Sequence, residues 1–192
     1  MWASRLQGTP LPERVTGSNL ISSLSAGAAA RGRSIYLLGG APGTAEAANK
    51  VLQARHPAIR IVGTRCPPMG FEHDLKQLAD LAAHVTNAAP DIVFVGLGSP
   101  KQERLIPHLR ANLPAAWWLG VGISFSFLCN KVKRAPRWVQ RAGFEWAHRL
   151  AGEPRRLARR YLREGIPFTA QLLTAAAWQG LRAGSERQPV ED

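Results

Sequence analysis

Cysteine is scarce in this sequence: its 192 residues include only Cys66 and Cys129, 63 positions apart and outside any CxxC pair. This excludes a disulfide framework and offers no zinc-binding pattern. Acidic residues are also few, 13 against 25 lysines and arginines, so the formal net charge is +12. Such an excess predicts an anionic partner such as phosphate, nucleic acid or a lipid surface.

Motifs that would indicate a particular chemistry are missing as well. There is no GxGxxG, which leaves a dinucleotide-dependent dehydrogenase only weakly supported, and no GxxxxGK[ST] loop for nucleoside triphosphates. Because the sequence has no DxD pair, HExxH or Cys/His cluster, we expect no bound metal and no cofactor. Without GxSxG, nothing nominates a serine–histidine–aspartate triad.

Long apolar runs are absent too. The first twenty residues contain Arg5, Glu13 and Arg14, so we expect no signal peptide. Two uncharged stretches, residues 111–130 and 165–181, are interrupted by prolines, glycines or amides, so we expect no transmembrane helix. The first stretch is better explained by a buried strand at 116–119, and the second is long enough to lie on a membrane surface.

What the sequence does contain is an alternation of short β-rich apolar runs with helical patterns. This alternation predicts an α/β domain with a mostly parallel sheet. We expect strands at residues 34–38, 59–63, 92–96 and 116–119, and helices at residues 18–30, 44–55, 73–87 and 101–112. The first helix is expected to begin without a cap. In the helix at 73–87, five residues at helical spacing are expected to face the sheet: Leu75, Leu78, Ala79, Ala82 and Val85.

Glycine-rich turns follow three of the predicted strands, at residues 39–43, 96–98 and 120–122. The carboxyl ends of parallel strands share one edge of a sheet, where ligands bind. Glycines there allow the backbone close to a ligand, and the helices that follow present free N–H groups to anions. Each turn taken singly is better explained by tight chain reversal. Three together favour a nucleotide or phosphate pocket.

The basic residues are concentrated in one segment. Residues 131–163 hold 11 lysines and arginines against Glu145 and Glu153, a net charge of +9. We therefore divide the chain into a domain at 1–130 and a basic helical appendage at 131–192. Pro154 is expected to end one helix and begin the next. On the second helix Arg155, Arg159 and Arg163 are spaced by four. The apolar face opposite is expected to consist of Leu157 and Tyr161 on this helix together with Trp146 and Leu150 before the break at Pro154.

A basic amphipathic segment of this kind suits an anionic membrane surface. A solvated helix face is the plain alternative. Nucleic acid is disfavoured as a partner, because no recognisable binding motif is present and the aromatic residues do not interleave with the arginines.

Several motifs, taken in order, closely resemble one family. They are RVTGS at 14–18, LGGAPG at 38–43, GLGSPKQE at 96–103, GVG at 120–122, KRAP at 133–136, EW at 145–146 and RL at 149–150. This series, from about residue 2 to residue 168, resembles the WecG/TagA/CpsF glycosyltransferases, and GLGSPKQE is its most specific part. The resemblance implies a Rossmann-like sheet and a basic appendage at the cytoplasmic face of the bacterial plasma membrane.

The resemblance also implies a reaction. An N-acetylmannosamine-type sugar would pass, with inversion, from a UDP donor to an undecaprenyl-diphosphate-linked sugar, without a metal, in the synthesis of cell-surface polysaccharides such as teichoic acid or exopolysaccharide. Inverting transfer requires a base for the acceptor hydroxyl and groups that stabilise the departing diphosphate.

By resemblance, Gln102 matches an active-site glutamine that would hydrogen-bond the donor. Arg149, Arg156 and Arg159 match appendage arginines that would neutralise diphosphate charge. The alternatives are a helix-capping glutamine and solvated arginines. We assign substrate binding to the remaining motif positions: Thr16, Gly17, Gly39, Gly40, Pro42, Gly43, Gly96, Gly98, Ser99, Pro100, Lys101, Glu103, Gly120 and Gly122.

The sequence departs from the family pattern in two places. The family's base aspartate and a nearby threonine lie upstream of the position of Trp2, so we expect this chain to lack them, to be inactive by itself and to expose apolar surface that favours homo-oligomers. After the GVG turn, SFSF at 124–127 replaces the more frequent Phe-Asp. The alternative function is a non-catalytic, basic protein that binds membranes or nucleic acid.

Overall fold

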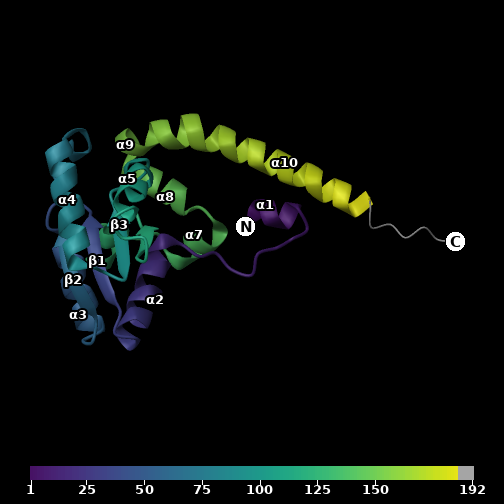
Figure 1. The fold of residues 1–192 in the computed structure, drawn as a ribbon. Coiled ribbons are helices and arrows are strands. Elements are labelled where there is room, and N and C mark those ends of the chain that lie inside the picture. Colours follow the sequence, from purple (N-terminus) through teal and green to yellow (C-terminus); the bar gives the residue numbers. More distant parts are fainter. Residues whose placement is uncertain (186–192) are drawn as a thin grey trace. The chain divides into compact units, whose positions relative to one another are not determined.

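The computed structural model describes residues 1–185, except for the side chains of residues 156, 160 and 183–185. The chain folds into two units (Figure 1). Residues 15–133 form one, and residues 1–14 together with residues 134–185 form the other. The division between residues 130 and 131 that the charge distribution predicts stays a prediction.

Four parallel strands form the sheet of the unit 15–133. They are β1 (Ser34–Gly39), β2 (Arg60–Arg65), β3 (Ile92–Gly96) and β4 (Trp117–Gly120). Their order is β2-β1-β3-β4, so β1 and β3 are central. The predicted α/β, Rossmann-like class is confirmed, and each strand lies within two residues of its expected range.

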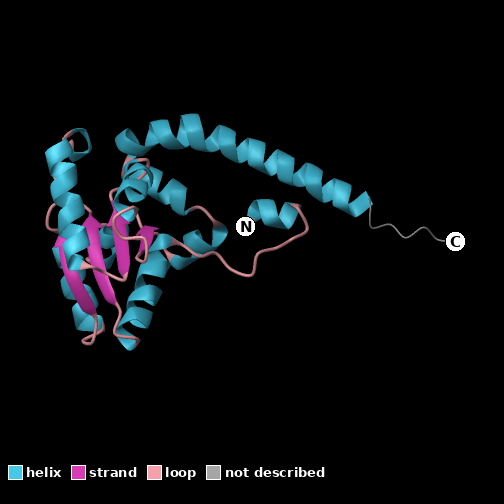
Figure 2. Ribbon diagram, viewed as in Figure 1, coloured by secondary structure: helices cyan, strands magenta, loops and turns pink. Residues whose placement is uncertain are grey.

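Helices cover both faces of this sheet (Figure 2). One face carries α2 (Gly17–Ala30), α3 (Thr44–Arg55) and α6 (Ser124–Leu128), and the other carries α4 (Leu75–Ala88) and α5 (Lys101–Arg110). Successive side chains of a strand point to opposite faces. Ile35 and Leu37 therefore pack with the first set of helices, whereas Tyr36 and Leu38 pack with the second. Both faces of the sheet are thus apolar and buried.

The start of α4 corrects part of the predicted helix face. The Asp74 carboxylate caps the helix by accepting first-turn N–H groups at 2.9 and 3.2 Å. Leu81 and Val85 are almost fully buried against the sheet. Leu75, in the first turn, is instead 83% exposed, and Ala79 is exposed as well. The prediction was wrong for these two residues and also missed Leu81.

Strand β4 is an edge strand, and the prediction of a buried strand there was wrong. Among the described residues its only strand neighbour is β3. The Trp117 side chain is 71% exposed, whereas Trp118 is partly buried and its Nε1–H donates to the Leu113 carbonyl at 3.3 Å. An apolar run alone does not reveal whether a second strand covers it.

A carboxylate joins the amino ends of the two central strands. The Asp91 side chain accepts hydrogen bonds from the Ser34 backbone N–H at 2.7 Å and from the Ser34 hydroxyl at 2.8 Å, and it pairs with Arg33 at 3.0 Å. These bonds, led by the backbone N–H, lower the pKa of Asp91 to about 2. Asp91 thus holds β1 and β3 in register at the edge opposite the glycine turns.

The other unit is helical. It contains α1 (Trp2–Leu6), α7 (Arg137–Ala142), α8 (Glu145–Gly152), α9 (Pro154–Ala158), the π-helical turn η2 (Arg159–Gly165) and α10 (Ile166–Ser185). Pro154 separates α8 from α9, as predicted. The π-helical turn breaks the expected continuous α-helix, because its wider winding changes which residues lie above one another.

The two expected faces of this basic segment persist despite the π-helical turn. Leu157 is buried, and the Trp146 and Tyr161 rings meet edge to face with centroids 6.0 Å apart. Arg155, Arg159 and Arg163 are exposed.

The helix α10 packs closely on α1 at Gly180. The Leu6 carbonyl lies so close to Gly180 that a side chain there would overlap it, and Gln7 donates to Gln179 at 2.6 Å. None of the helices in the described part of the chain combines the length and apolar character needed to cross a membrane.

Candidate functional site

Three glycine turns meet at the carboxyl edge of the sheet. Gly39 and Gly96 are partners at the ends of β1 and β3, and the Gly40 N–H donates to the Gly96 carbonyl at 3.0 Å. On the other side of β3, the Val121 N–H donates to the Val95 carbonyl at 2.8 Å. The turns at 39–43, 96–98 and 120–122 therefore lie beside one another.

The Phe125 ring packs under two of these turns. A Cβ atom on Gly96 would lie 2.7 Å from the ring, and one on Gly40 would lie 3.3 Å from it. Phe125 itself is 1% exposed. The ring thus occupies the space that side chains at these glycines would need. Sequence reasoning missed this role, because it treated the segment 124–127 only as a departure from a family pattern.

The amino end of α2 reaches the same edge. The Thr16 hydroxyl oxygen accepts the Asn19 N–H at 3.3 Å, so this helix is capped, and the expectation of an uncapped start was wrong. A Cβ atom on Gly17 would lie 3.5 Å from the Val121 Cα atom. Thr16 and Gly17 therefore adjoin the turn that follows β4.

A lysine from a later segment contacts the loop from β1 to α3. Gly43 takes the left-handed conformation, with φ at +71°, immediately before α3. The Lys131 ammonium donates to the Thr44 hydroxyl at 3.1 Å and to the Pro42 carbonyl at 3.5 Å. The cation thus lies beside a helix amino terminus, where anions are favoured. Lys131 was not among the predicted site residues, although the basic segment that begins with it was the available signal.

The same loop receives a thiol. Cys66 Sγ–H donates to the Gly40 carbonyl at 3.2 Å. Burial, followed by the charge of Glu46, raises the pKa of Cys66. The thiol is therefore protonated at neutral pH, and its donation to the carbonyl helps to hold the glycine loop.

The segment GLGSPKQE runs from β3 into α5. Gly98 has φ at +76° with no atom within 4 Å of its would-be Cβ, and its carbonyl accepts the Gln102 N–H at 3.0 Å. Ser99 and Pro100 complete the turn, and Pro100 takes the N-cap position of α5. The backbone here is open to a ligand.

Lys101, the first residue of α5, forms an ion pair with Glu72 from the short helix η1 (Phe71–His73). The hydrogen bond from Lys101 is the main cause that lowers the pKa of Glu72. The second Glu72 oxygen, Oε2, is buried and has no hydrogen-bond partner within the described residues. Glu72 was also missed, since a single carboxylate in a long loop gives no sequence signal.

Gln102 lies between two turns instead of capping its helix. Its side chain is 9% exposed, its Oε1 accepts the Gly122 N–H at 3.3 Å, and its Nε2 donates to Glu103 at 3.1 Å. No side chain caps α5. Gly120 and Gly122 thus sit against Gln102, on the turn next to GLGSPKQE.

The predicted arginines belong to the helical unit. The Arg149 Nε atom on α8 is buried and has no hydrogen-bond partner in the described part of the chain. Arg159 opens η2 and is exposed. The side chain of Arg156 lies outside the described residues. The roles assigned to all three stay predictions.

A partly buried ion-pair cluster in this unit also escaped sequence reasoning. Glu145, 16% exposed, pairs with Arg14 at 3.1 Å and with Arg134 at 3.0 Å. It thereby ties two segments, 131 and 11 residues away along the chain, to the first turn of α8. All three residues lie in motifs that the sequence analysis singled out, but their pairing could not be deduced from spacing.

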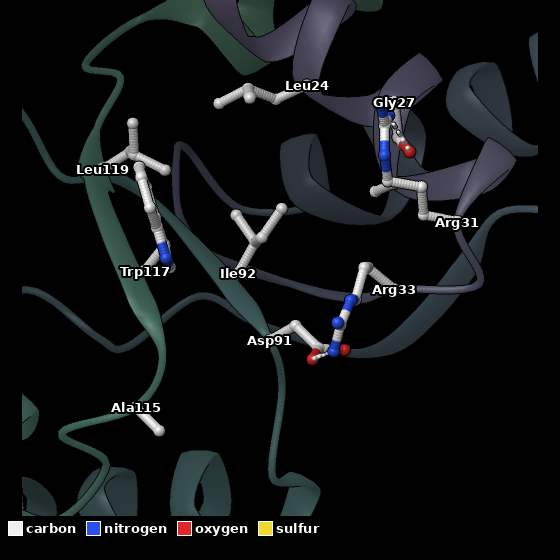
Figure 3. A pocket seen from close by; sticks show the side chains of 10 residues that line it. Leu24, Gly27, Arg31, Arg33, Asp91, Ile92, Ala115, Trp117 and Leu119 are labelled. Atoms are coloured by element: carbon white, nitrogen blue, oxygen red, sulfur yellow. Dashed lines mark hydrogen bonds and ion pairs between the residues drawn. The ribbon is translucent and has the colours of Figure 1, made fainter.

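A cavity of about 460 Å³ lies elsewhere, between α2 and the strands β3 and β4 (Figure 3). Its apolar lining includes Leu24, Leu119 and Trp117, and the Arg33–Asp91 ion pair lies at one end. Since that pair marks the amino ends of the strands, this cavity is not part of the glycine edge. Among the described residues, no three His, Cys, Asp or Glu side chains gather in a way that could hold a metal.

Taken together, the glycine edge offers open backbone, helix amino termini and nearby ammonium groups. These are groups that bind phosphate or diphosphate.

Comparison with known proteins supplies a context for this site. The sequence model of a family described as "Glycosyl transferase WecG/TagA/CpsF family" matches residues 1–182. A relative from Bacillus subtilis strain 168, named N-acetylglucosaminyldiphosphoundecaprenol N-acetyl-beta-D-mannosaminyltransferase, is 33% identical over 156 residues. A relative of the same name from Bacillus spizizenii strain W23 is 35% identical over 156 residues. Each match covers 81% of this chain and 59% or 58% of the relative, respectively, so the chain spans about three fifths of their length.

Proposed function

The chain belongs to the WecG/TagA/CpsF family of glycosyltransferases, and on this basis we propose that it binds a UDP-sugar of the N-acetylmannosamine type and serves its transfer to a lipid-diphosphate-linked sugar. The names of the two Bacillus relatives describe an N-acetylmannosaminyl transfer to an undecaprenol-diphosphate-linked N-acetylglucosamine. The single observation that carries the proposal is the meeting of the three glycine turns at one sheet edge. The pathway of the product is cell-surface polysaccharide synthesis.

We assign the nucleotide diphosphate to this edge on physical grounds. The positive φ angles of Gly43, Gly98 and Gly122 leave backbone without side chains at the three turns. The amino termini of α3 and α5 carry partial positive charge, and Lys131 adds a full one. Because these donors are held by the sheet before a ligand arrives, little ordering is needed on binding.

The transfer itself breaks the bond from the anomeric carbon to the UDP oxygen and forms one from that carbon to the acceptor hydroxyl oxygen. UDP leaves with the bonding electrons, and a base takes the hydroxyl proton. Two carboxylates near the glycine turns are engaged, Glu72 with Lys101 and Glu103 with Gln102.

Arginines of the helical unit are assigned to the acceptor diphosphate. The buried Arg149 Nε atom has an unmet donor, which an anionic oxygen would satisfy. The exposed guanidinium of Arg159 would add a bidentate contact to the same diphosphate.

A matched pair of glycine substitutions tests the nucleotide site. Gly98 and Gly32 both have positive φ, +76° and +61°, and neither has an atom within 4 Å of its would-be Cβ. Alanine at either position costs about 1–2 kcal/mol of backbone strain. Gly98 lies at the glycine edge, whereas Gly32 precedes β1 at the opposite edge.

In isothermal titration with UDP, we expect saturable binding that Gly98→Ala weakens roughly tenfold or more, a loss of about 1.4 kcal/mol. Gly32→Ala should leave the affinity unchanged at a similar loss of stability. Equal effects of the two variants, or no saturable UDP binding by the unaltered chain, would reject this assignment.

We also propose that the helical unit contacts an anionic membrane surface at the cytoplasmic face. Its exposed apolar side chains on α10 include Phe168, Trp178 and Leu181, and exposed arginines precede them on α9 and η2. Apolar side chains with flanking arginines are the features of helices that lie in the interface.

Co-sedimentation with vesicles distinguishes the partners. Binding to vesicles rich in phosphatidylglycerol but not to phosphatidylcholine vesicles is expected, and Phe168→Ser should weaken it. Leu75→Ser, which removes an even more exposed apolar side chain from the other unit, should not. Salt-sensitive binding to oligonucleotides with no binding to anionic vesicles would favour the nucleic-acid alternative instead.

The edge of β4 that has no strand partner among the described residues supports the expected self-association. Its exposed Trp117 and unpaired backbone groups are typical of strands that pair with another chain. Trp117→Lys should lower the mass measured by light scattering if this edge joins two copies, and an unchanged mass would contradict the proposal.

A further inference from the structure

Both ends of the Gln102 amide are used within the protein. The Oε1 atom accepts the Gly122 N–H at 3.3 Å, and the Nε2 atom donates to the Glu103 carboxylate at 3.1 Å. The side chain is only 9% exposed. A glutamine held in this way links the helix α5, which follows β3, to the turn that follows β4.

The two glycines of that turn are required for different reasons. Gly122 has φ at +55° and no atom within 4 Å of its would-be Cβ, so its requirement is conformational. Gly120 has no positive φ, but its would-be Cβ would lie 2.5 Å from Nε2 and 3.0 Å from Cδ of Gln102. The Gln102 amide therefore occupies the space of a side chain at Gly120.

We propose that Gln102 is a positioning residue: through its bond with the Gly122 N–H, it holds the turn at 120–122 beside the turn at 96–98. A glycine is needed at position 120 because any side chain there would overlap the Gln102 amide. The inference rests on the proposed nucleotide site. It differs from the expected role of Gln102 as a direct donor ligand, because its polar atoms already have partners in the ligand-free chain.

The physical effect is preorganisation. Within the described residues, the other hydrogen bonds of the turn are from the Val121 N–H to the Val95 carbonyl and from the Ser124 N–H and the Ser124 hydroxyl to the Val121 carbonyl. None of these bonds reaches Gly122. Without Gln102 the Gly122 peptide can rotate, and a ligand that needs its present orientation must then restore it on binding.

Gly120→Ala tests this proposal without altering Gln102. The methyl group meets the far end of a flexible side chain, so the amide moves aside and the fold is retained. We expect Gly120→Ala and Gln102→Ala each to weaken UDP binding roughly tenfold. In the double variant the loss should stay near that of one variant, because both remove the same Gly122 contact. Additive losses would overturn the proposal.

Hydrogen exchange at the Gly122 amide gives a readout that needs no ligand. It should quicken in both single variants of the ligand-free chain, while the Gly40 amide, bonded to the Gly96 carbonyl, keeps its rate. Unchanged exchange at Gly122 would overturn the positioning role even if UDP affinity falls. Absence of UDP binding by the unaltered chain, with the exchange effect present, would instead reject the nucleotide site and leave the role of Gln102 intact.

The conservative variant Gln102→Glu allows the proposal to be tested by measuring UDP affinity as a function of pH. In Gln102→Glu the protonated carboxyl has the shape of the amide and can still accept from Gly122 and donate to Glu103. As pH rises the new carboxyl ionises and loses the proton that it donated to Glu103, and repulsion between the two carboxylates then moves it away from the Gly122 N–H. The ratio of variant to unaltered affinity should therefore be near one at low pH and fall roughly tenfold at high pH. A ratio independent of pH would contradict the proposal.

Discussion

The ion-pair cluster around Glu145 provides the sharpest test of what stabilises the helical unit. Gln at this position keeps the shape of the side chain but removes its charge. One of its two ends then presents an N–H group to an arginine, so at least one of the bonds to Arg14 and Arg134 is lost. The remaining guanidinium groups lose the charge that they faced.

The magnitude follows from burial. A charge-assisted hydrogen bond contributes about 1.5–3 kcal/mol, and breaking a buried pair costs about 3–5 kcal/mol. The side chains of Arg14 and Arg134 are 35% and 23% exposed, so water can solvate them in part. We therefore expect Glu145→Gln to destabilise the helical unit by about 2–3 kcal/mol.

Hydrogen exchange reports this loss locally. Amides of α8 should exchange roughly 30- to 150-fold faster, the factor that corresponds to about 2–3 kcal/mol. The matched control is Asp80→Asn, which breaks the pair with Arg65 on the surface, where side chains are 62% and 40% exposed. That change should cost about 0–1 kcal/mol.

Salt separates the two variants further. At about 1 M salt, where the screening length is about 3 Å, the small effect of Asp80→Asn should vanish while that of Glu145→Gln persists. Equal losses in the two variants, or unchanged α8 exchange in Glu145→Gln, would refute the view that burial sets the strength of this cluster.

Three further substitutions test the sheet. Because the pKa of Asp91 is lowered to about 2, the free energy that its carboxylate adds to folding should be complete above about pH 4 and should fade as pH falls toward 2. Asp91→Asn should remove this part of the pH dependence of the free energy of unfolding in urea. Leu81→Ala should cost about 2–5 kcal/mol and Leu75→Ala less than about 0.5 kcal/mol, since only Leu81 is buried; similar midpoints in urea would contradict the assigned helix face. Phe125→Ala should cost about 3–5 kcal/mol and weaken UDP binding, because it leaves a cavity under two glycine turns; unaltered stability with full UDP affinity would show that the ring supports neither turn.

The local sequence pattern was sufficient to predict where the strands of the sheet and several of its helices lie. The helix at 44–55 has the predicted bounds, and the strands β1 and β3 lie within one residue of theirs. Short apolar runs and glycine turns are properties of neighbouring residues, so they can be recognised in the sequence. The same logic placed the glycine turns at one edge, because parallel strands share their carboxyl ends.

Local pattern failed where a neighbour distant in the sequence decided the outcome. Trp117 and Trp118 have the composition of a buried strand, but the strand order leaves β4 with one partner. Leu75 fits the helical period, yet the cap at Asp74 places it in an exposed first turn.

The sequence by itself determined the fold class, the glycine edge and the concentration of positive charge, because each is written in composition and in the spacing of adjacent residues. Tertiary structure alone decided that Gln102 holds Gly122, that Lys131 reaches the loop before α3, and that Arg14 meets Glu145. These contacts join residues 20, 87 and 131 positions apart, and their distances depend on how whole strands and helices pack, which no local spacing encodes.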